Sequence, residues 1–125
     1  MKQVIHTDKA PKAIGPYVQG WKVGNMIYTS GQLGIDVEKG GLADTVVEQA
    51  HCSMKNVGEI LRAAGADYAD IIKSTIFVKD LADFKAVNEV YASYFQGDFP
   101  ARSCVQVAAL PMGGLVEIEV VAIKE

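Results

Sequence analysis

Residues 70–80 read DIIKSTIFVKD, which is typical of a β-strand covered on both of its faces. The stretch is rich in β-branched residues, and apolar side chains occupy both sets of alternating positions. Helical patterns precede and follow it in the chain. We therefore expect a largely covered strand, with one helix before it and one helix after it.

The two expected helices are marked by the residues at their ends. The first begins at Thr45, because Thr45 and Glu48 have the spacing of a capping box, and it ends at Gly65. The second follows the central strand, with Asp80 as its expected N-cap and Gly97 as its expected end. Both helices carry apolar residues at three- and four-residue spacing, so each should bury one side.

Other stretches predict the remaining strands of a sheet. Residues 17–35 suggest two strands joined by a tight turn at Gly24 and Asn25, and residues 100–111 and 115–123 show further strand patterns. The resulting order is strand, strand, strand, helix, strand, helix, strand, strand. This order predicts a single α+β domain over residues 1–125, with both helices packed on one face of a mixed sheet.

The last expected strand carries apolar residues on both faces. One face holds Val116, Ile118 and Val120, and the other holds Glu117, Glu119, Val121 and Ile123. Two helices on one side leave the second face uncovered. Because aliphatic side chains on this face would be exposed to solvent in a monomer, we expect a homo-oligomer that buries it.

Composition and charge limit the classes of function. The 125 residues are 50% hydrophobic and 22% charged, which is ordinary for a globular protein. The net charge is −3 and the basic residues are scattered singly, so nucleic acid is not an expected partner. Cys52 and Cys104 are far apart in sequence, and together with His6 and His51 they form no disulfide framework or metal-ligand spacing. The first twelve residues are polar, and no apolar run approaches ~18 residues, so we expect a cytoplasmic protein.

The strand at residues 100–111, PARSCVQVAALP, places Arg102 and Cys104 on one face. A lone arginine on a strand is usually solvated or paired with an acidic neighbour. Cys104 beside it suggests an activated thiolate nucleophile as one interpretation. No histidine base accompanies it in sequence, so we expect a small, half-buried cysteine instead.

Several stretches, in the same order, resemble the Rid proteins, the reactive intermediate deaminases, and most closely the RidA subgroup. They are AIGPY (13–17), YTSGQLG (28–34), VNEVYASYF (87–95), PARSCVQVAALP (100–111) and VEIEVVA (116–122). The resemblance covers essentially the whole chain. It implies a homotrimer of chorismate-mutase-like fold with three clefts between subunits. It also implies hydrolysis of 2-imino acids, such as 2-iminobutanoate and 2-iminopropanoate, to 2-oxo acids and ammonia, with no metal and no organic cofactor.

The resemblance also assigns roles to individual residues. Arg102 matches the carboxylate-binding arginine of the family, and Glu117 matches its water-handling glutamate. The residues that match its cleft lining are Tyr17, Ser30, Gly31, Asn88 and Cys104. Two positions depart from the pattern: Val18 stands where a serine is expected, and Gly34 stands where many members have proline.

The chemistry of imine hydrolysis suits the two charged residues. A 2-imino acid carries a carboxylate beside an electrophilic C=N bond, and the planar fork of Arg102 matches a carboxylate bidentately. Glu117 can accept a proton from the attacking water and return it to the leaving ammonia. Glu119, two residues further along the same face, is the alternative for this role.

The remaining candidates have structural alternatives. Ser30 and Gly31 lie at an expected strand end, where they either hold the imine nitrogen or water, or form a simple turn. Tyr17 either presents its hydroxyl to the cleft or only packs. Asn88 interrupts an apolar helical row, so it is either a satisfied buried amide or a polar group that faces the cleft.

Three functions of different classes remain open. The first is an imine-hydrolysing enzyme. The second is an RNA-directed activity, as an endoribonuclease or a translation inhibitor, which the acidic balance and the lack of a basic stripe or paired-histidine site disfavour. The third is a non-catalytic metabolite sensor or chaperone-like trimer that uses the same arginine cleft.

Overall fold

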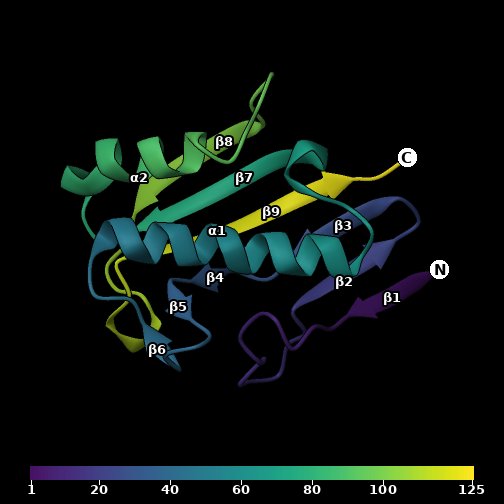
Figure 1. Cartoon of the computed structure of the whole chain (residues 1–125), viewed down its shortest axis with the longest axis horizontal. Helices are drawn as coiled ribbons and strands as arrows, with labels where there is room; N and C mark the ends of the chain where they lie inside the picture. The colour runs from purple at the N-terminus through teal and green to yellow at the C-terminus, as the bar shows by residue number, and fades with distance from the viewer.

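The computed structural model describes residues 1–125, and it places both helices on the same side of a mixed β-sheet (Figure 1). The sheet strands are β1 (Lys2–Ile5), β2 (Gly20–Val23), β3 (Met26–Thr29), β4 (Gln32–Leu33), β7 (Ile71–Val78), β8 (Ala101–Gln106) and β9 (Val116–Ile123). The helices are α1 (Val46–Ala63) and α2 (Phe84–Ala92), and β5 (Ile35–Asp36) pairs with β6 (Gly41–Leu42) in a separate hairpin. The α+β class and the mixed sheet predicted from the sequence are confirmed.

The strand order of the sheet is β1-β2-β3-β9-β7-β8, and β4 also pairs with β9. All of these pairs are antiparallel except β7 with β8, which is parallel because α2 forms the crossover between them. The central stretch at residues 70–80 supplies β7, which has β9 on one side and β8 on the other. The two termini lie at the same end of the sheet (Figure 1).

Helix α1 has the ends that the sequence predicts. The Thr45 side chain accepts a hydrogen bond from the Glu48 backbone N–H at 3.1 Å. At the other end, Gly65 adopts a left-handed φ of 85°, which glycine tolerates without strain. Local sequence therefore suffices to define this helix.

The start of α2 differs from the prediction. Asp80 accepts a hydrogen bond from the Ala82 N–H at 2.9 Å, but it caps a 3₁₀ turn (Leu81–Asp83) that leads into α2. Asp80 is therefore one turn further from α2 than an N-cap.

The end of α2 also differs: the helix ends at Ala92, five residues before Gly97. The Tyr94 and Phe95 N–H groups donate to the Tyr91 and Ala92 carbonyls, three residues back, at 3.2 Å each, so the α-helical hydrogen-bond pattern is lost there. The Tyr94 ring lies 5.1 Å from the Tyr68 ring between centroids, which holds Tyr94 against the segment after α1. The Phe95 ring lies 4.8 Å from the Tyr91 ring, but an α-helix also brings residues four apart together, so this contact does not end the helix.

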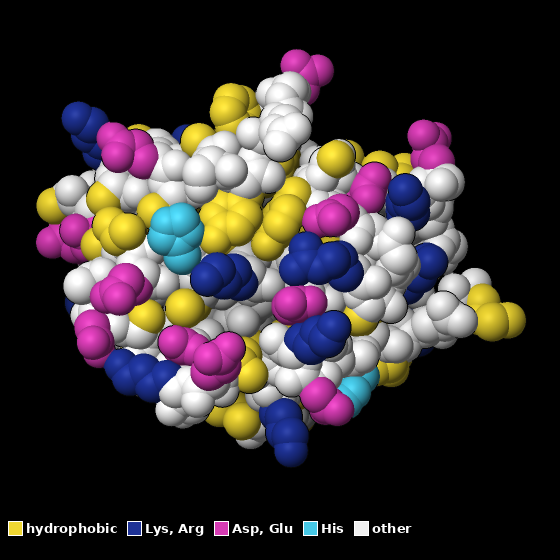
Figure 2. Space-filling view, in the orientation of Figure 1, with side chains coloured by type: hydrophobic (Ala, Val, Ile, Leu, Met, Phe, Trp, Pro, Cys, Tyr) yellow, Lys and Arg dark blue, Asp and Glu magenta, His cyan; other side chains and the backbone are white.

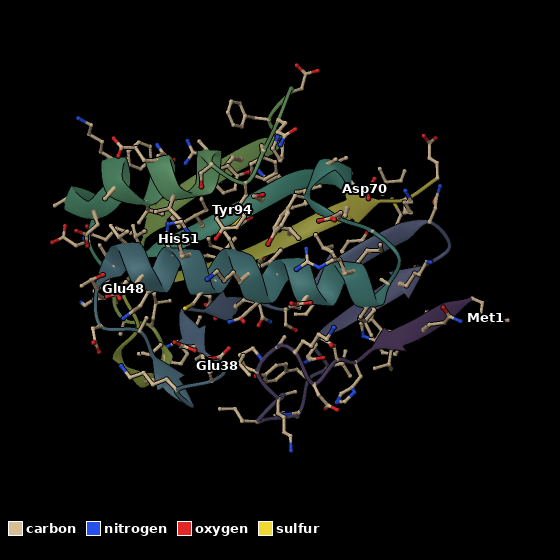
Figure 3. The ribbon with its side chains drawn as sticks, viewed as in Figure 1. Met1, Glu38, Glu48, His51, Asp70 and Tyr94 are labelled. Carbon is tan, nitrogen blue, oxygen red and sulfur yellow. The ribbon has the colours of Figure 1, made fainter.

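A polar contact joins α1 to the segment after α2 within this aromatic layer. His51 on α1 lies close to Tyr94 (Figure 3), and the His51 Nδ1 lies 2.8 Å from the Tyr94 hydroxyl. Burial raises the pKa of the Tyr94 hydroxyl. The neutral hydroxyl can either donate to the His51 ring nitrogen or accept from it, depending on the tautomer of the ring.

Strand β1 was not predicted from the sequence. It pairs antiparallel with β2 at the edge of the sheet, where three of its four residues are exposed. An exposed edge strand needs no alternation of apolar and polar residues, and Lys-Gln-Val-Ile at positions 2–5 shows none.

The core lies between the helices and the sheet. Its most deeply buried large side chains are Ile27, Met54, Ile60, Leu61, Ile76 and Ile118. The opposite face of the sheet has no covering layer and carries Tyr28, Phe77, Val105 and Val121, of which Tyr28 and Val105 are 46% and 43% exposed. The apolar face expected from the sequence is therefore present, and its burial in an oligomer stays a prediction.

Charges on the helix-covered face are mixed. Figure 2 shows lysine and arginine side chains interspersed with aspartate and glutamate over this face, without a large area of one sign. No helix in the structure has both the length and the apolar character needed to cross a bilayer.

Candidate active site

A break in the pairing along β9 positions the first group of candidate residues. Strands β3 and β4 pair with the same strand, β9, at residues 121–123 and 117–118 respectively. Between them, Ser30 and Gly31 leave the ladder. The Ser30 N–H donates to the Gln19 carbonyl at 2.8 Å, and the Ser30 hydroxyl donates to the Val18 carbonyl at 2.6 Å. Ser30 and Gly31 thus lie at the end of β3, as the sequence predicts.

Gly31 lies directly against the Glu117 side chain. A Cβ atom added at Gly31 would lie 2.8 Å from the Glu117 Cδ and 2.9 Å from its Oε2. Any other residue would displace the carboxyl group, because real Cβ atoms do not approach so closely. The glycine therefore does more than form a turn: it leaves the space that the carboxyl group occupies.

The surroundings of Glu117 favour its neutral form. Partial burial raises the pKa of the Glu117 carboxyl, and the like charge of Glu119 raises it further. Burial removes water from the carboxylate, and Glu119 projects from the same face of β9 two residues away. A carboxyl group with a raised pKa can exchange protons closer to neutral pH, as general acid–base catalysis requires.

A cavity of about 940 Å³ lies at this break. It brings together four of the predicted site residues and the alternative carboxylate: Tyr17, Ser30, Gly31, Glu117 and Glu119. Tyr17 is half-exposed, and its hydroxyl accepts a hydrogen bond from the Ile14 N–H at 3.4 Å. Its ring therefore lines the cavity and does not lie in the core.

The cavity also has lining residues that the sequence did not single out. Gln19 is buried, accepts from the Thr7 N–H at 2.7 Å and donates to the Pro11 carbonyl at 2.9 Å, so it fixes the loop that carries Tyr17. Met112 is exposed and has a left-handed φ of 61°, which is strained for a side chain of this type. The polar Gln19 in an otherwise apolar stretch was a usable signal, but nothing in the sequence marks Met112.

The second group of candidate residues lies on the other face of the sheet. The pairing of β7 with β8 aligns Arg102 with the buried Ser74 and Cys104 with the buried Ile76. Arg102 and Cys104 therefore share the helix-covered face. Glu117 is aligned with Phe77 and projects from the uncovered face. A single chain does not bring Arg102 and Glu117 together.

Arg102 has no acidic partner within the chain. No carboxylate lies within 4 Å of it, so the ion-pair alternative has no counterpart here. The guanidinium carbon lies 5.3 Å from the centre of the Phe84 ring, and the Nη1 atom is buried without a hydrogen-bond partner. A buried donor without a partner is costly, and an incoming carboxylate would satisfy it.

Asn88 and Cys104 lie near Arg102. Asn88 is one helical turn after Phe84 on α2, and thus on the side of the helix that meets Arg102. Its amide is half-buried and makes no hydrogen bond within the chain. Burial raises the pKa of the Cys104 thiol, and the nearby Arg102 only partly offsets this effect. Cys104 is therefore not an activated thiolate in this chain.

Comparisons with known proteins identify the family to which the chain is similar. The model of the family described as Endoribonuclease L-PSP matches residues 7–124. A 2-iminobutanoate/2-iminopropanoate deaminase from Capra hircus is 52% identical over 99% of this chain and 91% of its own length, and one from Salmonella typhimurium is 49% identical over 99% of both chains. The crystal structure of E. coli TdcF with bound serine superposes with a TM-score of 0.95 at 47% identity over 98% of this chain and 99% of its own. A putative endoribonuclease from Thermotoga maritima gives a TM-score of 0.96 at 48% identity over 100% of this chain and 99% of its own.

Proposed function

The chain belongs to the Endoribonuclease L-PSP family, and we propose that it hydrolyses 2-imino acids such as 2-iminobutanoate and 2-iminopropanoate to 2-oxo acids and ammonia. Relatives that are about half identical over the whole chain carry the name of this deaminase. The structural observation that carries the proposal is Arg102, whose buried Nη1 has no partner and suits a substrate carboxylate.

The separation of Arg102 and Glu117 supports an active site shared between two copies of the chain. Each copy offers one half-site with Glu117, Gly31, Ser30 and Tyr17, and another with Arg102, Asn88 and Cys104. The uncovered apolar face carries Glu117, so covering it with a second copy would bring a second set of residues to the cavity. A ring of three copies, in which each face meets the next, yields three equivalent sites. A homotrimer is therefore part of the proposal.

The proposed reaction follows from the chemistry of the two half-sites. The Arg102 guanidinium binds the substrate carboxylate and fixes the orientation of the C=N bond. The Glu117 carboxylate removes a proton from water as the water oxygen bonds to the imine carbon. The imine nitrogen takes up this proton, which gives a carbinolamine with a hydroxyl and an amino group on the same carbon. Glu117 then passes the hydroxyl proton of the carbinolamine to the amino nitrogen, the C–N bond breaks, and ammonia leaves as the C=O bond forms. The carbon keeps its oxidation state, so no electron acceptor is consumed.

The other candidate residues have supporting roles in this proposal. Ser30 and the Gly31 backbone hold the water or the imine nitrogen beside Glu117, and Tyr17 closes one side of the cavity. Asn88 and Cys104 line the part of the cleft around Arg102. Hydrogen bonds from such groups would orient the substrate before water adds.

An RNA-directed activity is the alternative suggested by the family's description. The net charge is −3, and on the helix-covered face in Figure 2 the basic side chains are interspersed with acidic ones, so this face offers no extended basic surface for phosphates. We propose that nucleic acid is not a partner, and that the protein acts in the cytoplasm on imines that other enzymes release. Retention on RNA at physiological salt, together with ribonuclease activity that survives repeated purification, would contradict this.

A coupled assay tests the activity. A threonine dehydratase generates 2-iminobutanoate, semicarbazide traps it, and the protein is added at increasing concentration. We expect less trapped semicarbazone as the protein removes the imine first. Unchanged trapping at all concentrations would contradict the enzyme proposal, and binding of a substrate analogue without turnover would favour the metabolite sensor.

Mixing two inactive variants tests the shared site. Arg102→Lys and Glu117→Gln chains are unfolded together, refolded and compared with each variant refolded alone. In a three-membered ring, every mixed trimer has one site with an intact Arg102 and an intact Glu117 from different chains. Random mixing should therefore restore roughly a quarter of wild-type activity. A site within one chain predicts no restoration.

A further inference from the structure

The position of the Glu117 carboxyl group depends on a very short strand. Strand β4 has two residues, Gln32 and Leu33, and its register with β9 aligns Leu33 with Glu117. This register places Gly31 against the Glu117 carboxyl group. Two residues of pairing are few to fix a register, so other contacts must hold β4 and β9 in place.

Gln49 in the first turn of α1 makes contacts with both sides of this pairing. It is 4% exposed, and its side-chain carbonyl accepts from the Leu115 N–H at 2.9 Å, directly before β9 begins. Its amide donates to the Ala43 carbonyl at 3.0 Å. Ala43 in turn donates its N–H to the Gly34 carbonyl at 3.0 Å, directly after β4 ends. A continuous chain of hydrogen bonds thus runs from the end of β4 through Gln49 to the start of β9.

Gly34 allows Gln49 to come close. A Cβ atom added at Gly34 would lie 2.6 Å from the Gln49 backbone carbonyl oxygen, so the segment after β4 packs directly on the helix backbone. Both polar groups of the Gln49 amide are satisfied, and both are bound to backbone. The first turn of α1 therefore links the end of β4 to the start of β9 and supports their short pairing.

We propose that Gln49 is a positioning residue that holds Glu117 against Gly31 by tying the start of β9 to the end of β4. Gln49 does not line the cavity, so it acts through the backbone and not on the substrate. This inference rests on the proposed role of Glu117. Loss of the Gln49 amide should move the Glu117 carboxyl group, whereas Arg102, on the opposite face of the sheet, should keep its place.

The test compares Gln49→Met with Asn56→Leu. Asn56 is a matched control, because it is also a buried amide of α1 and contacts only the β4 side of the pairing. It donates to the Ile35 carbonyl at 2.9 Å and to the Leu33 carbonyl at 3.4 Å, and it makes no hydrogen bond to β9. Each variant is measured for kcat, KM, melting temperature and hydrogen exchange at the Leu115 amide. A misplaced catalytic group costs on the order of 10²-fold, so we expect Gln49→Met to lose roughly ten- to hundredfold in kcat with little change in KM. Its Leu115 amide should exchange faster, while Asn56→Leu should keep kcat and Leu115 protection near wild type.

The outcomes separate this inference from the proposed function. A normal kcat for Gln49→Met, with Glu117→Gln inactive, would overturn the inference and leave the proposed function intact. Equal losses of kcat in Gln49→Met and Asn56→Leu would also overturn it, because the tie from Gln49 to the start of β9 would then add nothing to the contacts that hold β4. An active Glu117→Gln would instead contradict the proposed function itself.

Discussion

Arg102 and Glu117 project from opposite faces of one β-sheet. The register of β7 with its two neighbours aligns Arg102 with the buried Ser74, and Glu117 with Phe77 on the uncovered face. Side chains on opposite faces cannot converge on one small substrate. The proposed chemistry therefore needs a second copy of the chain, and the predictions for the two residues can be tested separately.

Arg102→Lys should retain the charge and lose the planar fork. A hydrogen-bonded charge contact to a substrate carboxylate is worth ~2–4 kcal/mol, which corresponds to roughly thirty- to thousandfold in rate. The melting temperature should hardly change, since Arg102 has no ion-pair partner to lose. Arg62→Lys is the matched control, because Arg62 also lies over an aromatic ring, that of Tyr68, but is paired with Glu59 and Asp67. If Arg102→Lys lowers stability and leaves the rate per folded protein unchanged, Arg102 is structural.

Glu117→Gln should fold and assemble normally but lose most of its turnover. The amide keeps the shape of the carboxyl group and cannot accept a proton, and general base catalysis contributes ~10²–10⁴-fold. Because burial raises the pKa of Glu117, the folded state disfavours its charge, so the variant should melt at the same temperature as wild type or higher at neutral pH. Glu119→Gln should keep the maximal rate. The reverse ranking of the two variants would assign the base to Glu119.

The pH profile should report the raised pKa of Glu117. Only the ionised carboxylate accepts a proton, so kcat/KM should fall as the pH drops through this pKa, at a higher pH than for an ordinary glutamate. Glu119→Gln removes the neighbouring like charge and should move this acid limb to lower pH. An acid limb that stays in place in Glu119→Gln would show that another group controls it.

Gly31→Ala should lower the rate without unfolding the protein. The new methyl group would meet the Glu117 Cδ at 2.8 Å and displace the carboxyl group, which we expect to cost about tenfold or more in kcat. Gly41→Ala serves as the control, because a Cβ at Gly41 meets no atom within 4 Å and its φ is not in the left-handed region. Equal rates for the two variants would mean that the contact between Gly31 and Glu117 has no role in turnover.

Local sequence predicted those features that depend on near neighbours in the chain. The cap at Thr45, the end of α1 at Gly65 and the turn at Gly24 were predicted correctly, since each depends on hydrogen bonds or backbone angles within a few residues. The alternation along residues 116–123 separated Glu117 from the core. The resemblance to a family was equally local, because it rested on short motifs read in order.

Tertiary structure decided what depends on contacts between distant segments. The edge strand β1 depends on pairing with β2, and the early end of α2 goes with the packing of Tyr94 on Tyr68. Neither contact leaves a pattern in nearby sequence. The role of Gln49 also leaves no pattern in nearby sequence, because its partners, Ala43 and Leu115, lie on two different loops. Alternation within one strand sorts its residues into two faces, but it does not say which face of one strand matches which face of another. Only the register of β8 and β9 with β7 put Arg102 on the helix-covered face and Glu117 on the open face. A shift of one residue in either pairing would turn the side chains of that strand to the other face, and Arg102 and Glu117 would then share a face.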